Sequence, residues 1–166
     1  MRDHPGNGVC TLRAAIQEAE AQATDDTIDF DIPASDPGYN GSFWTIGLFS
    51  ALPDLIGNLT MQGPGEVLFT IARAATESFR IFTVSGTETI DLSGLTLTNS
   101  DAGGDNGGAI LNEGGGTLNV TNCTVNSNHA NRGAGISNQS TSTTNVINST
   151  VSNSSLRSPL TFAGRA

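Results

Sequence analysis

The sequence predicts an all-β fold, a parallel β-solenoid of about four to five coils preceded by one helix. The first observation is a repeat, because TLNVTNCTVNSN at residues 117–128 returns 26 residues later as TTNVINSTVSNS at residues 143–154. The second is an earlier copy, TIDLSGLTLTNS at residues 89–100, which matches at a spacing of 28 residues. The third is the apolar pattern: within each copy the apolar residues first occupy one set of alternate positions and then shift to the other set. Such coils must stack to bury their apolar residues.

The composition indicates one folded domain with few charges. The 166 residues suffice for a single core, and Val, Ile and Leu recur at intervals that disordered chains lack. The net charge is −9, and all seven cations are Arg. An acidic surface repels phosphates, which makes nucleic acid and anionic membranes poor partners. No apolar run approaches the roughly 20 residues of a transmembrane segment.

Each copy contains a predicted corner. Leu118 and Val120 share one strand parity, whereas Cys123 and Val125 share the other. Since alternate residues of a strand face one side, both pairs can point inward only if the chain bends between them. Gly and Asn tolerate positive φ better than other residues, so the bend is predicted at the position occupied in successive coils by Gly94, Asn122 and Asn148.

Stacking the copies about 4.8 Å apart predicts columns of side chains in the interior. The four inward columns are Ile90/Leu118/Thr144, Leu92/Val120/Val146, Leu95/Cys123/Ser149 and Leu97/Val125/Val151. Stacked amides stabilise such arrays, which predicts two ladders, Asn112 on Asn138 and Asn122 on Asn148.

The earlier part of the chain is less regular. FRIFTV at residues 79–84 is predicted to be a strand, and TIDFDI at residues 27–32 alternates apolar inward with acidic outward positions. Residues 10–23 form an amphipathic helix with Thr11 as N-cap, which can cover the end of the apolar columns. We therefore expect an N-terminal segment with a capping helix (1–26), coils (27–155) and an irregular, truncated tail (156–166).

The N-terminal segment DHPGNGVCTLRAAIQEA resembles the CSLREA-type motif, with Ala14 at a position where that family usually carries Glu. This motif precedes right-handed parallel β-helix repeats in bacterial and archaeal secreted or surface proteins. NLTMQGPG and the pattern of the later repeats also resemble that family, so the resemblance covers about residues 6–154. It implies a right-handed β-helix and an extracellular or cell-surface location. The first ten residues contain no apolar h-region of a signal peptide, so we expect a start codon assigned too late or an incomplete gene.

Outward strand positions are rich in hydroxyl and amide groups and poor in ionisable ones. A sugar-cleaving site needs a pair of acid and base groups, and Asp91 is the only ionisable residue at these positions. Hydrogen bonding to carbohydrate or protein is the chemistry that remains. The candidate binding residues are Thr96, Thr98, Thr124, Asn126 and Thr150. Asn, Asp and Ile interrupt the threonines, which argues against the strict rows that ice binding would need.

Two loops hold the remaining candidates. In DAGGDNGG, the oxygen ligands of Asp101, Asp105 and Asn106 could hold Ca²⁺, but the loop matches no calcium motif, occurs once and is better explained as a solvated turn. NHANRG places His129 near Arg132 in the next coil. If the protein is an enzyme, Asp101, Asp105 and Arg132 are the catalytic candidates. No other cofactor is expected.

The two cysteines are expected to be structural. Cys123 belongs to an inward column and Cys10 to the helical cap, and neither forms part of a metal or nucleophile motif. Toward the C-terminus the inward positions become polar, and Pro159 cannot continue a ladder. We therefore expect either a longer natural protein or a frayed tail that leaves the last coil open.

Two functions remain open. The first is a non-enzymatic, adhesin-like or envelope-associated surface scaffold that binds carbohydrate or protein. The alternative is a β-helix polysaccharide lyase or glycoside hydrolase, or a truncated part of one. The sequence does not indicate the ligand or the oligomeric state.

Overall fold

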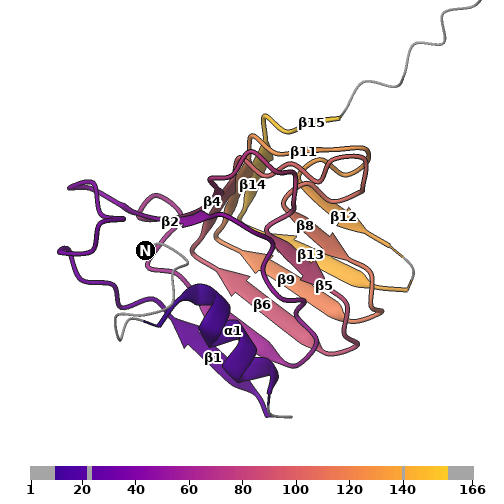
Figure 1. The fold of residues 1–166 in the computed structure, drawn as a ribbon. Coiled ribbons are helices and arrows are strands. Elements are labelled where there is room, and N and C mark those ends of the chain that lie inside the picture. Colours follow the sequence, from indigo (N-terminus) through magenta and orange to yellow (C-terminus); the bar gives the residue numbers. More distant parts are fainter. Residues whose placement is uncertain (1–9, 22–23, 140, 157–166) are drawn as a thin grey trace, which may run out of the picture.

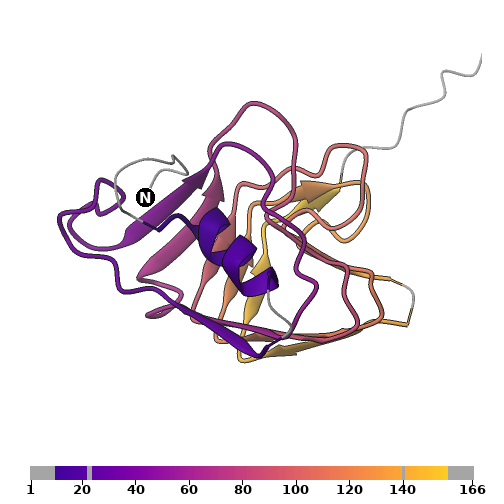
Figure 2. The ribbon, with the colours of Figure 1, turned by 60° about the horizontal axis from the view of Figure 1, so that its bottom comes forward.

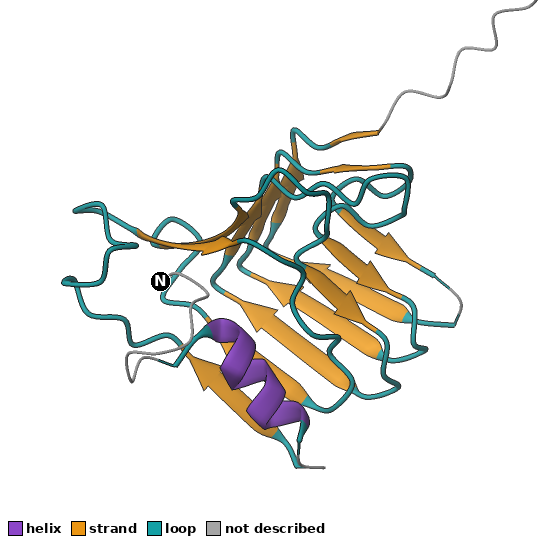
Figure 3. Ribbon diagram, in the orientation of Figure 1, coloured by secondary structure: helices purple, strands orange, loops and turns teal. Residues whose placement is uncertain are grey.

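The computed structural model describes residues 10–21, 24–139 and 141–156 and shows a parallel β-solenoid of about four turns (Figure 1). Three parallel sheets run along the stack (Figure 3), with five, five and three strands. The first sheet has the order β1 (Asp26–Asp29), β3 (Leu59–Gln62), β6 (Thr89–Ser93), β9 (Thr117–Thr121), β13 (Thr143–Ile147). The second has the order β2 (Trp44–Leu48), β4 (Phe69–Arg73), β7 (Thr96–Thr98), β10 (Thr124–Asn126), β14 (Thr150–Ser152).

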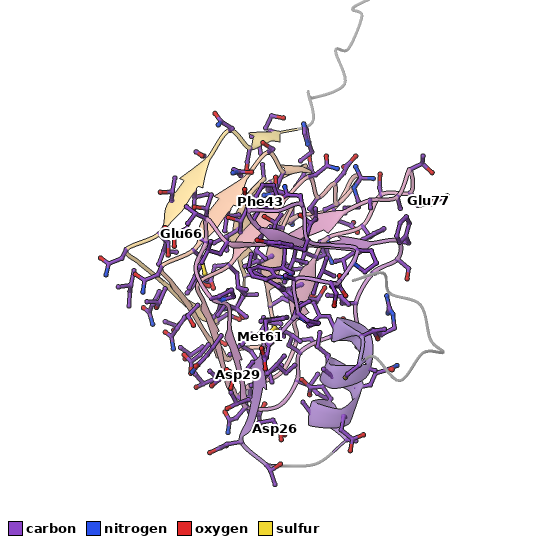
Figure 4. The ribbon with its side chains drawn as sticks, turned by 90° about the vertical axis from the view of Figure 1, so that its left-hand side faces the viewer. Asp26, Asp29, Phe43, Met61, Glu66 and Glu77 are labelled. Atoms are coloured by element: carbon purple, nitrogen blue, oxygen red, sulfur yellow. The ribbon has the colours of Figure 1, made fainter. Side chains whose placement is uncertain are left out.

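The third sheet is shorter, because it begins later in the chain. It consists of β5 (Phe82–Val84), β8 (Ile110–Asn112) and β12 (Ile136–Asn138). A two-stranded pair, β11 (His129–Ala130) with β15 (Ser155–Leu156), lies where the third side of the last coils begins. Figure 4 views the stack from the helix end, with Met61 in the interior and Glu77 at the periphery.

The predicted columns are confirmed wherever strand register tests them. Leu118 is the partner of both Ile90 and Thr144, and Val120 is the partner of Leu92 and Val146. Val125 pairs likewise with Leu97 and Val151. The columns also extend back into the irregular part of the chain, because Leu59 and Met61 lie under Ile90 and Leu92 and Ile71 lies under Leu97. One continuous apolar core results.

The predicted corner is confirmed in all three coils. Gly94, Asn122 and Asn148 have φ of 63°, 51° and 47°. The chain bends again five residues later, where Asn99, Ser127 and Asn153 have φ of 58°, 54° and 49°. The sequence analysis missed this second corner, because Ser does not share the tolerance of Gly and Asn for positive φ.

The first corner carries Gly in one coil for a second reason. A Cβ atom on Gly94 would lie 2.5 Å from the carbonyl oxygen of Gly63, which belongs to the loop after β3. Gly94 N–H and C=O groups also link the two neighbouring coils, since Gly94 donates to Thr121 and accepts from Gly65. The loop between β3 and β4 therefore packs directly on this corner and leaves no room for an Asn side chain.

The helix α1 (Leu12–Glu20) covers the N-terminal end of the stack beside β1 (Figure 2). Thr11 is the N-cap as predicted, and its hydroxyl accepts the N–H of Ala14 at 3.1 Å. Leu12 and Ile16 are buried in the core, whereas the helix is shorter than the predicted 10–23. Arg13 ties the helix to the loop after β2 by donating to the carbonyls of Ser50 and Ala51.

One of the two predicted amide ladders is confirmed. Asn112 Nδ2 donates to Asn138 Oδ1 at 3.1 Å. The ladder of Asn122 on Asn148 was wrong: both residues form exposed corners, and their side chains share no hydrogen bond within the described part of the chain. A different ladder forms on the outer side of the first sheet, where Asn145 donates to Asn119 and Asn119 donates to Asp91 (2.8 and 2.6 Å).

The two ends of the described chain differ in burial. Residues 27–32 alternate as predicted, with Ile28, Phe30 and Ile32 half-buried, although β1 itself ends at Asp29. In the last coil, by contrast, β13 and β14 expose inward positions that are buried one coil earlier. The predicted irregular tail lies outside the described residues from residue 157 onward.

Substitutions at Asn122 test the corner. Replacement by Gly should leave the free energy of unfolding within about 0.5 kcal/mol, because Gly adopts positive φ without strain. Replacement by Val should lower it by about 1–2 kcal/mol, the cost of forcing a β-branched residue into the left-handed region. Thr121→Val, one residue earlier in β9, is the control and should change little. Equal stability of the Gly and Val variants in urea titrations would contradict this account of the corner.

Candidate functional site

A single column of threonines runs along the outer side of the second sheet. Each strand contributes one threonine at the same register: Thr45 pairs with Thr70, Thr70 with Thr96, Thr96 with Thr124, and Thr124 with Thr150. Two residues farther along each strand lies a second outward column, made of Gly47, Ala72, Thr98, Asn126 and Ser152. We call these two columns the threonine face.

All five candidate binding residues from the sequence lie on the threonine face. Thr96, Thr124 and Thr150 belong to the first column, and Thr98 and Asn126 to the second. The sequence analysis missed Thr45 and Thr70, because the first two coils lack the period of the later ones. A signal was present, since an inward aliphatic residue follows this threonine in every coil: Thr45-Ile46, Thr70-Ile71, Thr96-Leu97, Thr124-Val125 and Thr150-Val151. The expectation that no strict threonine row exists was therefore wrong for this column.

The hydroxyls of the threonine face fall into two groups. Thr96 donates to the carbonyl of Glu66 and Thr98 donates to Asn126 Oδ1, both at 2.6 Å. The hydroxyls of Thr70, Thr124 and Thr150 form no hydrogen bond with any other described residue. They stand on paired strands, so their spacing along the sheet is fixed at about 4.8 Å per coil. These hydroxyls can bind a partner without first breaking a bond within the chain.

The threonine face is neutral and has an apolar border. None of its outward strand positions carries a charge, although the chain has a net charge of −9. Three apolar residues flank its N-terminal strands in the sequence: Phe43 precedes β2, Phe49 follows β2, and Val67 lies in the loop before β4, next to Glu66, whose carbonyl accepts from Thr96. Phe49 and Val67 are 55% and 77% exposed. The surface therefore offers hydroxyl groups beside apolar contacts.

The loop candidates also come together in the fold. Asp101 forms a parallel bridge with His129, and Asn106 forms one with Arg132. The backbone links the two loops further, because Asn131 donates to the carbonyl of Asp105 at 2.8 Å. The sequence-predicted pair His129 and Arg132 thus lies one coil above Asp101 and Asp105, and both side chains of that pair are exposed.

The carboxylates of this loop cluster have structural partners. Asp101 accepts the N–H of Gly103 at 2.9 Å and the hydroxyl of Ser78 at 3.3 Å. Asp105 lies 3.6 Å from the guanidinium of Arg80, which also donates to the carbonyl of Asn106 at 3.0 Å. Arg80 was missed by the sequence analysis, because it lies outside the aligned repeat. Its positive charge beside Asp105 and Asn106 disfavours Ca²⁺ at this loop.

Two further observations bear on chemistry at the loop cluster. A pocket of about 290 Å³ opens beside it, lined by Asp54, Arg80 and Asp105 among others. Asp54 accepts the hydroxyl of Ser85 at 3.0 Å, so this carboxylate is also held by a neighbour. Across residues 10–21, 24–139 and 141–156, no three His, Cys, Asp or Glu side chains gather closely enough to hold a metal ion.

The two cysteines differ in environment. Cys10 is exposed, and Cys123 is buried in the column between Leu95 and Ser149. The backbone N–H of Cys123 donates to Ser149 Oγ at 3.0 Å, which fixes the next coil above it. Burial raises the pKa of the Cys123 thiol above its ordinary value. Cys123 is therefore a packed, protonated core residue, as the sequence predicted.

Comparison of the chain with family models, curated proteins and solved structures gives no match. Within the described ranges, no helix has the length and apolarity to cross a membrane. The site must therefore be interpreted from its own geometry.

The raised pKa of Cys123 predicts a loss of stability in alkali. Above the pKa of a free thiol, about 8.5, the unfolded chain gives up the thiol proton while the folded chain keeps it, so the free energy of unfolding falls. Between pH 7.5 and 9.5 the free energy of unfolding should decrease, and the part of the decrease due to this thiol should disappear in Cys123→Ala. Urea unfolding at both pH values measures the difference. An identical pH dependence in the variant would refute the assignment.

Proposed function

We propose that this protein is a non-enzymatic β-solenoid scaffold whose threonine face binds a neutral, extended glycan. The observation that carries the proposal is the threonine column, which is unbroken from Thr45 to Thr150. Across the five strands of the second sheet it presents hydroxyls along roughly 19 Å of one direction, at about 4.8 Å per strand. A linear polymer with repeated hydroxyl groups suits such a row, because each unit can meet a copy of the same group.

The chemistry of the face favours a glycan over a charged polymer. Hydroxyls both donate and accept, so they can match sugar hydroxyls of either orientation. The absence of charge on the outward strand positions removes the long-range attraction that charged polymers would need. Apolar side chains at the border, such as Phe49, can cover the C–H faces of sugar rings. Binding is expected to be weak per coil and to gain strength from the number of coils.

The proposed setting is extracellular or on the cell surface, in an adhesin-like or envelope-associated role. The support is the resemblance of residues 6–154 to the CSLREA-type β-helix proteins, which also makes a right-handed solenoid the expected form. Low charge and a surface of Thr, Asn and Ser are compatible with that setting. A protein ligand would use the same face, and the binding test below distinguishes it from a glycan.

Two other functions have less support. Ice binding would use the threonine column, but the neighbouring column changes from Gly47 to Ser152 and so gives regular spacing in one direction only. A polysaccharide lyase or glycoside hydrolase would use the loop cluster. There the carboxylates of Asp101 and Asp105 are already held by Gly103, Ser78 and Arg80, which favours a structural role.

Removing unpaired hydroxyls tests glycan binding. The double variant Thr70→Val/Thr124→Val keeps the side-chain shape and deletes two hydroxyls from the threonine face. Each hydrogen bond contributes about 0.5–1.5 kcal/mol, so binding to a neutral polysaccharide should weaken by roughly tenfold. Affinity electrophoresis through gels containing neutral polysaccharides measures the change.

The matched control for this test lies on the first sheet. Thr89→Val/Thr117→Val makes the same change at two register partners there and should leave retention unaltered. Equal loss in both double variants would mean that general stability, rather than the threonine face, governs binding. If immobilised proteins retained the wild-type protein and none of the polysaccharides did, the proposal of a glycan ligand would be overturned.

Turnover assays on the same polysaccharides separate the scaffold from the enzyme. The scaffold proposal predicts no release of reducing ends or unsaturated products. Cleavage by the wild-type protein would overturn it. If cleavage were seen and then lost in Asp101→Asn/Asp105→Asn/Arg132→Ala, the loop cluster would be the catalytic site; activity unchanged in that variant would exclude the cluster instead.

A further inference from the structure

The threonine face carries an aromatic ring at its N-terminal strand. Gly47 belongs to the second outward column, and a Cβ atom on it would lie 4.0 Å from Cε2 of Phe49. The phenyl ring of Phe49 therefore reaches back over the outer side of β2. Phe49 is also 55% exposed, so the ring touches the strand and still presents a large part of its surface to solvent.

Small residues beneath the ring make room for it. The second column is polar in its last three strands, but its first two positions are Gly47 and Ala72. Gly47 has no positive φ, so packing rather than backbone conformation explains the glycine. A Cβ atom there would lie 3.2 Å from Cβ of Ala74, and a longer side chain would compete with the ring of Phe49 for the same space.

The second sheet ends at the strand that carries this ring. β2 is the first strand of the sheet, and its outer edge is covered by the segment before it. Thr45 donates its N–H to the carbonyl of Gly38 at 2.8 Å, and Tyr39 forms an antiparallel bridge with Trp44. An extended polymer that follows the threonine column toward the N-terminal strands would reach Phe49 at the last of them.

We propose that Phe49 is the anchor of the glycan site and that it selects a chain of pyranose rings with equatorial substituents. This inference rests on the proposed function and names the class of glycan. A pyranose of this kind has only axial C–H bonds on its faces, and such a face can cover the weakly negative face of an aromatic ring. Equatorial linkages also keep the chain extended, as a straight row of threonines requires.

The hydroxyls of the stacked sugar have partners nearby. In such a sugar the hydroxyls point sideways from the edge of the ring, parallel to the protein surface. Thr45 and Thr70 are register partners, and they lie two residues, or about 7 Å, along their strands from Gly47 and Ala72. A sugar on Phe49 can therefore direct one edge toward the hydroxyl of Thr70 while its face stays on the phenyl ring.

Substitutions at Phe49 test the anchor. The probe is cellohexaose, whose linkages are equatorial, and the comparison is maltohexaose, the same sugar with one axial bond in each linkage. Isothermal titration calorimetry should show tighter binding of cellohexaose by the wild-type protein. Phe49→Ala should weaken this binding by about fivefold, the order of one aromatic stacking contact, whereas Phe49→Tyr keeps the ring and should bind like wild type.

A matched control and a second readout separate stacking from a loss of stability. Ile56→Ala should leave binding unchanged, because Ile56 is 50% exposed but lies against Gly86, which follows β5 of the third sheet. Protons above an aromatic ring shift upfield, so the axial C–H protons of cellohexaose should shift upfield with wild type and Phe49→Tyr. The same protons should not shift with Phe49→Ala.

The outcomes distinguish this inference from the proposed function. If Phe49→Ala bound cellohexaose like wild type while Thr70→Val/Thr124→Val bound it less, the threonine face would remain the glycan site and Phe49 would not be its anchor. Tighter binding of maltohexaose would overturn the equatorial class. If neither oligosaccharide bound, the class named here would be wrong, and the electrophoresis with other neutral polysaccharides would decide the proposed function separately.

Discussion

Parallel, in-register stacking of successive coils is the constraint on which the rest of this structure depends. It makes each side chain meet the residue at the same position one coil away, about 4.8 Å distant. An apolar residue then meets an apolar residue, and Leu92, Val120 and their partners become a continuous core. A polar side chain must be able to lie next to the side chain at the same position of the neighbouring coil. This condition explains the ladder in which Asn145 donates to Asn119 and Asn119 to Asp91.

The same condition explains why so few charges occur along the strands. Two like charges stacked about 4.8 Å apart repel by roughly 1–3 kcal/mol at a protein surface, and every further coil repeats the cost. Asp91 is tolerated because its neighbour in the column is an amide that donates to it. Most other charges lie in the loops or at strand ends, as where Arg80 reaches Asp105. Low charge and a threonine-rich surface are thus consequences of the architecture as much as of function.

Stacking also imposes conditions on the turns, because a polar group that is buried between two coils needs a hydrogen-bond partner in one of those coils. Asn128 meets this condition with both ends of its amide: Oδ1 accepts the N–H of Ser100, and Nδ2 donates to the carbonyl of Leu97. Its own N–H donates to Ser154 Oγ in the next coil. Ser100, Asn128 and Ser154 form a polar column beside the apolar ones. A buried Asn is therefore structural here, and its polarity indicates no ligand.

Sequence reasoning succeeded where a position repeats and failed where its role depends on neighbours outside the repeat. The columns and the corner at Asn122 could be predicted, because parity and positive φ are properties of the strand itself. The ladder of Asn122 on Asn148 could not be excluded, since nothing local distinguishes an Asn that bends the chain from one that stacks. Thr45 was missed because irregular loops before it hide the period. Arg80 was missed because its contacts with Asp105 and Asn106 join segments more than twenty residues apart.

The constraint that builds the threonine face also determines how deeply each inward side chain is buried. A row of identical hydroxyls exists because each coil copies the one below it, so Thr150 occupies the same place as Thr124. Copying also gives the last described coil the same inward valines as the coil before it, with Val146 paired to Val120 and Val151 to Val125. An N-terminal helix closes one end of this series with Leu12 and Ile16. In the last described coil Val146 and Val151 are 46% and 48% exposed, so the burial of an inward valine depends on the coils on both of its sides.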